Sequence, residues 1–271
     1  MDNTNFGEHF ALQTPKGHLT ASLHFPPHRD RYDAREGKEL IVMLHGFSGT
    51  RYETYGLFEK AAAHFAHHGY HVLRFDFRGC GDSHGTSMDV YPSAQIEDTF
   101  WAIEYVTALP ELRGLATCHL LGFSFGGVVA ALSASARPEM FRTLTIWEGP
   151  FNLGRELKRA FEPIDYDALW AQGYLANGDS RLNAHLFYEL DHLDLAASLS
   201  SYSGPVLVIS GTADDIVPFQ PNHQEWLEHL RNAQLSEALI KGADHGFTGD
   251  AQRCQAVDVT TQFLARYRPG Q

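Results

Sequence analysis

Residues 120–129 read LLGFSFGGVV and place one serine between two apolar runs. Gly122 and Gly126 stand two residues before and after Ser124, which gives the pattern G-x-S-x-G. A core strand has no need of these glycines, and a surface loop would not carry leucines and valines at both ends. The stretch therefore predicts a sharp turn from a strand into a helix, with the serine hydroxyl at its tip. The glycines would let the strand and the helix approach each other closely.

The runs around this turn belong to a repeating pattern of strands and helices. Apolar runs predict strands at 39–46, 70–76, 117–124, 142–149, 205–211 and 235–242. Helical patterns predict helices at 53–68, 93–109, 126–136, 220–231 and 251–267. Because the strands are apolar on both faces and alternate with helices, we predict an α/β fold with a mostly parallel, doubly wound sheet. An antiparallel hairpin at 9–26, with its turn at PKG, is expected at the sheet edge.

Residues 151–200 interrupt this alternation. They contain no good strand but several helical patterns, and they stand between the fourth and fifth of the predicted strands. We interpret them as a small helical cap inserted into one core that is formed by residues 1–150 and 201–271. The cap is rich in aromatic side chains, and we expect Trp170 and Tyr174 to line a substrate pocket while most other rings pack the cap onto the sheet.

Composition limits the classes of function. The chain has 271 residues, 44% of them hydrophobic, which suffices for a sizeable core in one or two domains. A formal net charge of -12 repels phosphate backbones and anionic lipids, so neither nucleic acid nor a membrane is an expected partner. The three cysteines form no CxxC pair, and the start MDNTNFGEHF lacks the pattern of a secretory leader. We therefore expect a reduced, cytoplasmic protein whose oligomeric state is open, a homodimer being one alternative.

Three histidines have a spacing that could bind a metal ion on one helix face: His64, His67 and His68. They stand at the end of a predicted helix, just before Gly69, where histidines suit the helix dipole and glycine suits the cap. We favour this structural interpretation and expect no metal and no cofactor.

Ser124 needs a base to remove its proton before it can act as a nucleophile. His245 lies in the small polar loop KGADHGF, after the last predicted strand, where such a base is expected. The base needs an acid to orient it, and Asp214, Asp215 and Glu148 all follow predicted strands and could reach it.

An oxyanion formed at Ser124 needs two N–H donors. The residue after the nucleophile, Phe125, supplies one backbone amide. The HGFSG loop after the first parallel strand brings the amide of Phe47 near the turn. We expect His45 and Gly46 to shape this loop rather than to react.

Together these motifs resemble those of serine α/β-hydrolases of the esterase and acyl-hydrolase kind. The matching stretches are HGF at 45–47, DFRGCGDSHG at 76–85, GFSFGG at 122–127, GTADDIVP at 211–218 and DHGF at 244–247. The resemblance implies the α/β-hydrolase fold and gives the acid role to Asp214 rather than Asp215. It also gives Asp76 and Arg78 a structural role in their loop. The short cap and the forms of two motifs are most similar to bacterial carboxylesterases of the cinnamoyl (feruloyl) type.

The resemblance implies a hydrolase that cleaves small carboxylic esters through an acyl-enzyme, without a cofactor. Ser124, His245 and Asp214 would form its catalytic triad. The same triad serves acyl thioesterases and hydrolases of carbon–carbon bonds, so both alternatives stay open. A non-catalytic binding protein with this fold is a further alternative, although every triad position is filled here.

Overall fold

The computed structural model describes residues 7–27, 38–230 and 233–269. Its main strands are β1 (Glu8–Thr14), β2 (Gly17–His24), β3 (Lys38–Leu44), β4 (His71–Phe75), β5 (Leu115–Phe123), β6 (Thr143–Trp147), β9 (Pro205–Gly211) and β10 (Gln234–Ile240). They form one sheet in the order β1-β2-β4-β3-β5-β6-β9-β10. The β1–β2 and β2–β4 pairs are antiparallel, and the other pairs of this sheet are parallel. The predicted sheet and its edge hairpin are confirmed.

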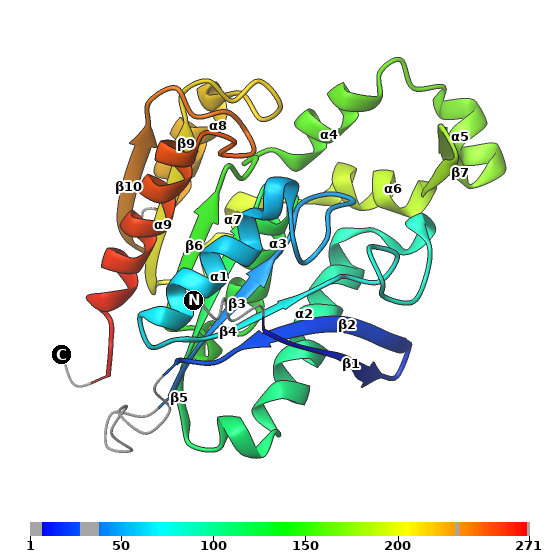
Figure 1. Cartoon of the computed structure of the whole chain (residues 1–271). Coiled ribbons are helices and arrows are strands. Elements are labelled where there is room, and N and C mark those ends of the chain that lie inside the picture. The colour runs from blue at the N-terminus through cyan, green and yellow to red at the C-terminus, as the bar shows by residue number, and fades with distance from the viewer. Residues whose placement is uncertain (1–6, 28–37, 231–232, 270–271) are drawn as a thin grey trace.

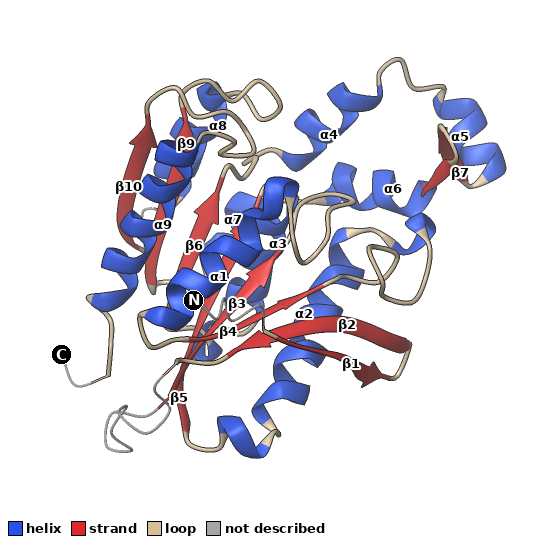
Figure 2. Ribbon diagram, in the orientation of Figure 1, coloured by secondary structure: helices blue, strands red, loops and turns tan. Residues whose placement is uncertain are grey.

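Helices cover both faces of the sheet (Figure 2). The main ones are α1 (Leu57–His67), α2 (Pro92–Thr107), α3 (Phe125–Ala136), α8 (Phe219–His229) and α9 (Asp250–Ala265). On one face α1 and α9 bury Phe58 and Phe263 in a common apolar cluster. On the other face α2, α3 and α8 bury side chains such as Val128 and Trp226 in a second cluster. The central strands are apolar on both sides because each side faces helices.

Residue 231, where the helix predicted at 220–231 ends, lies outside the described residues. The first six residues of the stretch MDNTNFGEHF also lie outside them. Among the described helices, none is both long and apolar enough to cross a bilayer.

The turn between β5 and α3 has a backbone that few residues adopt. Ser124 has φ 54° and ψ −124°, which is a strained conformation for a residue with a side chain. A Cβ on Gly122 would lie 2.1 Å from the carbonyl oxygen of Gly126, and a Cβ on Gly126 would lie 2.1 Å from that of Leu44. Both flanking positions therefore require glycine, as the sequence pattern predicts.

The segment between β6 and β9 contains α4 (Leu153–Phe161), α5 (Tyr166–Gln172), α6 (Ala184–His192) and α7 (Leu195–Leu199). It also contains a hairpin of β7 (Tyr174–Asn177) and β8 (Ser180–Asn183), so the prediction that it holds no strand was wrong. The hairpin is short and Leu182 is its one buried residue, so its sequence shows no alternation. The signal that could have found it is Asn177-Gly178, a typical hairpin turn, in which Gly178 has φ 56°.

Two hydrogen bonds anchor this segment to the rest of the chain. Arg155 of α4 donates a hydrogen bond to Glu225 of α8 at 2.8 Å. Asn183, which ends β8, donates to the carbonyl of Met88 in the core at 3.0 Å. Between these anchors α5 and β7 extend away from the sheet (Figure 1). The final helix, α7, packs against α3.

The three clustered histidines lie at the end of α1. The rings of His64 and His68 stack with their centroids 4.3 Å apart, and His67 is exposed. The described residues contain no group of three or more His, Cys, Asp or Glu side chains placed to hold a metal ion.

Gly122→Ala should destabilise the protein, because the added methyl group would meet the Gly126 carbonyl and separate β5 from α3. We expect the free energy of unfolding in urea to fall by about 2–4 kcal/mol. Gly114→Ala is the control without a clash, since Gly114, unlike Gly122, has positive φ (+84°) and has nothing within 4 Å of an added Cβ. It should lose only the conformational term of about 1–2 kcal/mol. Equal losses in both variants would contradict the steric explanation.

Candidate active site

Ser124, His245 and Asp214 come together beyond the carboxyl ends of β5, β10 and β9. The Nε2 atom of His245 lies 3.0 Å from Ser124 Oγ, and its Nδ1 lies 2.7 Å from Asp214 Oδ2. A carboxylate only accepts hydrogen bonds, so Nδ1 carries the proton and Nε2 is free to accept one from the serine. This is the arrangement in which a histidine acts as a general base toward a hydroxyl.

The carboxylate of Asp214 is held from its other side. Its Oδ1 accepts the N–H groups of Ile216 and Val217 at 2.9 and 2.8 Å. Asp214 is buried, whereas Asp215 is exposed. Of these two neighbouring acids, the structure brings Asp214 to His245.

Glu148, the third acid considered, follows β6 and is 2% exposed. Its Oε1 accepts the N–H of Gly211 at 2.6 Å, and the carbonyl of Gly211 accepts the N–H of Asp214 at 3.4 Å, so Glu148 lies against the turn that carries Asp214. Burial and the neighbouring Asp214 carboxylate raise the pKa of Glu148 to about 10. Glu148 is therefore a neutral acid beside Asp214, and Asp214 is the carboxylate that receives the histidine N–H.

The HGFSG loop after β3 passes close to the serine. A Cβ on Gly46 would lie 3.2 Å from the Cβ of Ser124, and the rings of Phe47 and Phe125 are 5.6 Å apart. Within the part of the chain that the structure describes, neither phenylalanine amide has a hydrogen-bond acceptor. Phe125 is also the first residue of α3, where the helix dipole favours negative charge. These two amides are suited to receive an oxyanion.

Two further side chains fix this loop. His45 is buried, and burial lowers its pKa to about 4, so its ring is neutral. Its Nε2 accepts the N–H of Phe77 at 3.0 Å, and its Nδ1 donates to the Gly46 carbonyl at 2.8 Å. From the other side, Glu53 accepts the Gly46 N–H at 2.6 Å. The expectation that His45 shapes the loop agrees with these bonds.

Sequence reasoning missed Glu53. The predicted helix 53–68 began at Glu53, but α1 begins at Leu57, and Glu53 lies in the preceding loop with φ 56°. Burial raises its pKa, and this effect outweighs the hydrogen bonds from backbone N–H groups. No signal in the sequence identifies such a contact.

Asp76 and Arg78 form ion pairs that hold the DFRGCGDSHG loop in place. Asp76 accepts the backbone N–H of Arg51 at 2.5 Å and pairs with its guanidinium. Arg78 pairs with the buried carboxylate of Asp98 at 2.6 Å and with Glu97 at 2.7 Å. These contacts support the structural role that the family resemblance implies for both residues.

Trp170 belongs to α5 and Tyr174 begins β7, the two elements that extend away from the sheet (Figure 1). Trp170 lies on α5 with 48% of its surface exposed, and the guanidinium of Arg181 lies 4.6 Å from the Tyr174 ring. Their role in a substrate pocket stays a prediction. Phe161 of α4 reaches the HGFSG loop, with its ring centroid 6.0 Å from that of Phe47.

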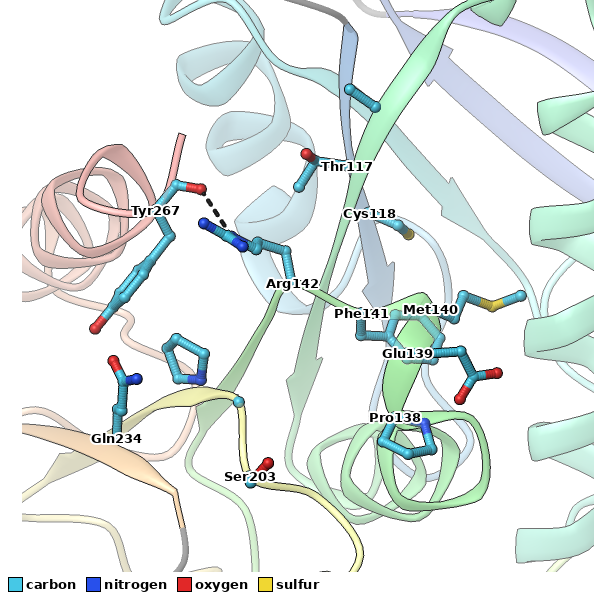
Figure 3. Close-up of a pocket in the computed structure, with 13 residues that line it drawn as sticks. Thr117, Cys118, Pro138, Glu139, Met140, Phe141, Arg142, Ser203, Gln234 and Tyr267 are labelled. Atoms are coloured by element: carbon cyan, nitrogen blue, oxygen red, sulfur yellow. Dashed lines mark hydrogen bonds between the residues drawn. The ribbon is translucent and has the colours of Figure 1, made fainter. Parts of the chain in front are cut away.

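A pocket of about 510 Å³ lies at the amino ends of the parallel strands, opposite the end that carries Ser124 (Figure 3). Its lining includes Thr117 near the start of β5, Gln234 at the start of β10 and Arg142, which donates to the Tyr267 carbonyl at 3.2 Å. Ligands of open α/β sheets bind outside the carboxyl ends of the strands. This pocket is therefore separate from the site around Ser124.

Comparison with known proteins assigns the family. The family model described as the alpha/beta hydrolase fold matches residues 39–191, more than half of the chain. The chain therefore belongs to the α/β-hydrolase family, a class of hydrolytic enzymes.

Individual relatives are more distant. The candidate carbamate hydrolase RutD of Pseudomonas syringae pv. syringae is 28% identical over 202 residues, covering 63% of this chain and 74% of the relative. Est1E of Butyrivibrio proteoclasticus, solved with ferulic acid, superimposes with a TM-score of 0.80 at 18% identity and covers 95% of this chain and 98% of its own. Mouse alpha/beta hydrolase domain-containing protein 10 gives 0.73 at 18% identity, with 96% and 99% covered. At these identities the two structures show a shared fold.

Asp214→Ala should slow the reaction of Ser124 with a fluorophosphonate by orders of magnitude, because His245 would lose its preferred tautomer. Removing this acid costs about 10⁴-fold in kcat in serine triads. The matched control is Asp215→Ala, which changes an exposed neighbour and should label at the wild-type rate. If the two variants label equally fast, Asp214 is not the orienting acid.

Proposed function

We propose that this protein is a serine hydrolase that cleaves small carboxylic esters through an acyl-enzyme. The observation that carries the proposal is the chain of hydrogen bonds from Ser124 through His245 to Asp214, at 3.0 and 2.7 Å. Membership in the α/β-hydrolase family supports it. The two free amides beside the serine support acyl transfer, because this reaction builds negative charge on a carbonyl oxygen.

Acylation begins when Ser124 Oγ attacks the ester carbonyl carbon while His245 Nε2 takes the serine proton. The carbonyl oxygen becomes an oxyanion, which the amides of Phe47 and Phe125 hold by two hydrogen bonds. Asp214 stabilises the imidazolium that forms without taking its proton. When the tetrahedral intermediate collapses, the carbon–oxygen bond of the ester breaks and His245 gives its proton to the leaving alcohol.

Deacylation repeats these steps with water. His245 takes a proton from the water as its oxygen attacks the acyl carbon, and the same amides hold the second oxyanion. Collapse of this intermediate breaks the bond to Ser124 Oγ, which recovers a proton from His245. The products are one carboxylic acid and one alcohol, and the side chains return to their starting protonation states.

Carbamates are the second candidate substrates, and the 28% identity to RutD favours them. The same triad would form a carbamoyl-serine in place of an acyl-serine. A carbamoyl group is less electrophilic than an acyl group, so its transfer to water should be slower. The rate at which water cleaves the modified serine after the first turnover distinguishes esters from carbamates as substrates.

The proposed function is tested with p-nitrophenyl esters, methyl ferulate, an acyl thioester and an aryl carbamate, all at one pH. We expect turnover of the oxygen esters to exceed that of the thioester and the carbamate, and we expect Ser124→Ala to abolish it. The control is Ser135→Ala, which removes a buried hydroxyl of α3 that donates a hydrogen bond to the Ala131 carbonyl, and it should retain activity. Faster turnover of the thioester or the carbamate than of the oxygen esters would contradict the assignment as an esterase.

We further propose that the cap selects the substrate. Phe161→Ala should change the ratio of kcat/KM for feruloyl over butyryl esters by about tenfold, because a ring beside the oxyanion loop would be lost. Trp170→Ala and Tyr174→Ala test the earlier prediction in the same assay. Unchanged ratios in a folded Phe161→Ala variant would show that this ring only packs against Phe47.

A further inference from the structure

We propose that Glu148 is a positioning residue that donates a hydrogen bond from its carboxyl group to Asp214 and so holds the acid that orients His245. This inference deepens the proposed function and rests on the role that it gives to Asp214. Nothing in the G-x-S-x-G or GTADDIVP motifs requires a second acid here.

The backbone at Glu148 is arranged to bring its side chain to this place. Glu148 has φ 48°, in the left-handed region that residues with side chains rarely occupy. Its N–H donates to the carbonyl of Ile209 at 3.0 Å, which fixes it beside the end of β9. A Cβ on Gly211 would lie 2.6 Å from Glu148 Oε1, so the glycine makes room for the carboxyl group. The side chain is thereby held between the ends of two neighbouring strands.

The hydrogen bonds assign the shared proton to Glu148. Glu148 is fixed on the N–H of Gly211, and the N–H of Asp214 donates to the Gly211 carbonyl at 3.4 Å, so both acids are held by one turn. Two ionised carboxylates cannot hydrogen-bond each other, so a hydrogen bond between them needs one proton. Asp214 accepts N–H bonds from His245, Ile216 and Val217, which stabilise its charged form. Glu148 accepts one such bond, from Gly211. The neutral form therefore belongs to Glu148.

The charges around Glu148 act in the same direction. Asp214 and Asp244 both oppose its ionisation, and His245 lies on the far side of Asp214. The pKa of Glu148 is raised first by burial and then by Asp214, to about 10 from an ordinary value of 4.5. The folded protein thus keeps a proton that the unfolded chain releases. The stability that protonated Glu148 contributes is complete below about pH 4.5 and is lost as the pH rises through about 10.

A donor at this position restrains Asp214. Two backbone amides fix Oδ1, and His245 occupies Oδ2, while the hydrogen bond from Glu148 limits rotation and movement of the whole carboxylate. A hydrogen bond to a charged group is among the stronger ones in proteins. We expect its loss to slow acylation about tenfold to a hundredfold.

The experiment compares Glu148→Gln with Glu148→Ala. Glutamine keeps both functions, because its amide N–H₂ can donate to Asp214 and its carbonyl can accept from Gly211. We expect Glu148→Gln to label with a fluorophosphonate within about threefold of the wild-type rate, and Glu148→Ala to label tenfold to a hundredfold more slowly. The same loss should appear in kcat for a p-nitrophenyl ester, with KM little changed.

The pH dependence of stability provides a readout independent of activity. The Tm of Glu148→Gln minus that of the wild type should increase between pH 6 and pH 9, because only the wild type carries the acid whose ionisation destabilises the fold. Glu39→Gln is the matched control, since Glu39 is a buried glutamate near the opposite end of the sheet, paired with His119. Its difference from the wild type should not increase in this window.

Three results would overturn the proposal. Glu148→Ala could label as fast as the wild type, Glu148→Gln could label as slowly as Glu148→Ala, or the Tm difference could stay constant with pH. Labelling does not depend on the substrate, so a wild type that labels at Ser124 but cleaves no ester refutes the ester assignment while the variants still test Glu148. If Ser124 is not labelled in the wild type, both proposals fail.

Discussion

The close approach of β5 and α3 at Ser124 is the constraint on which the site depends. The serine adopts a left-handed backbone conformation, and its N–H donates to the Trp147 carbonyl of β6 at 2.8 Å. This places the hydroxyl beyond the strand ends, with the first N–H groups of α3 beside it. Glycine at 126 lets the helix start lie against the end of β3, and the HGFSG loop that follows β3 is then within reach of the same hydroxyl. The proposed nucleophile and the proposed oxyanion donors are thus positioned by one steric arrangement.

The order of strands explains the pairing of acids. Because β6 lies directly beside β9 in the parallel sheet, the residues that follow these two strands meet at one edge. Glu148 and Asp214 occupy these two positions, and their environments divide the roles between them. Asp214 accepts N–H bonds from His245, Ile216 and Val217, whereas Glu148 accepts one from Gly211, and burial raises its pKa. In the proposed arrangement, one of the two carboxyl groups is therefore the acceptor and the other the donor.

The sequence predicted the features that depend on local sterics and on pattern. Apolar runs located the strands of the parallel sheet, and the glycines around Ser124 identified its turn because no other residue fits there. The choice of Asp214 over Asp215 needed the family motif, since two adjacent loop acids are equivalent until one is buried. The contacts of Glu53, the proton on Glu148 and the proximity of Phe161 to Phe47 depend on how distant segments pack, which no periodicity records. The β7–β8 hairpin was missed because its residues are too exposed to alternate.

In the proposed mechanism, Ser124 carries the acyl group during turnover. The most direct measurement mixes enzyme rapidly with p-nitrophenyl trimethylacetate, whose acyl group leaves a serine slowly, and follows p-nitrophenolate release while acid-quenched protein is weighed by mass spectrometry. If Ser124 is acylated, the burst equals the enzyme concentration, the protein mass increases by one acyl group, and that group is found on the peptide containing Ser124. Release without a burst and without an acylated protein, or an acyl group on any other residue, would contradict it.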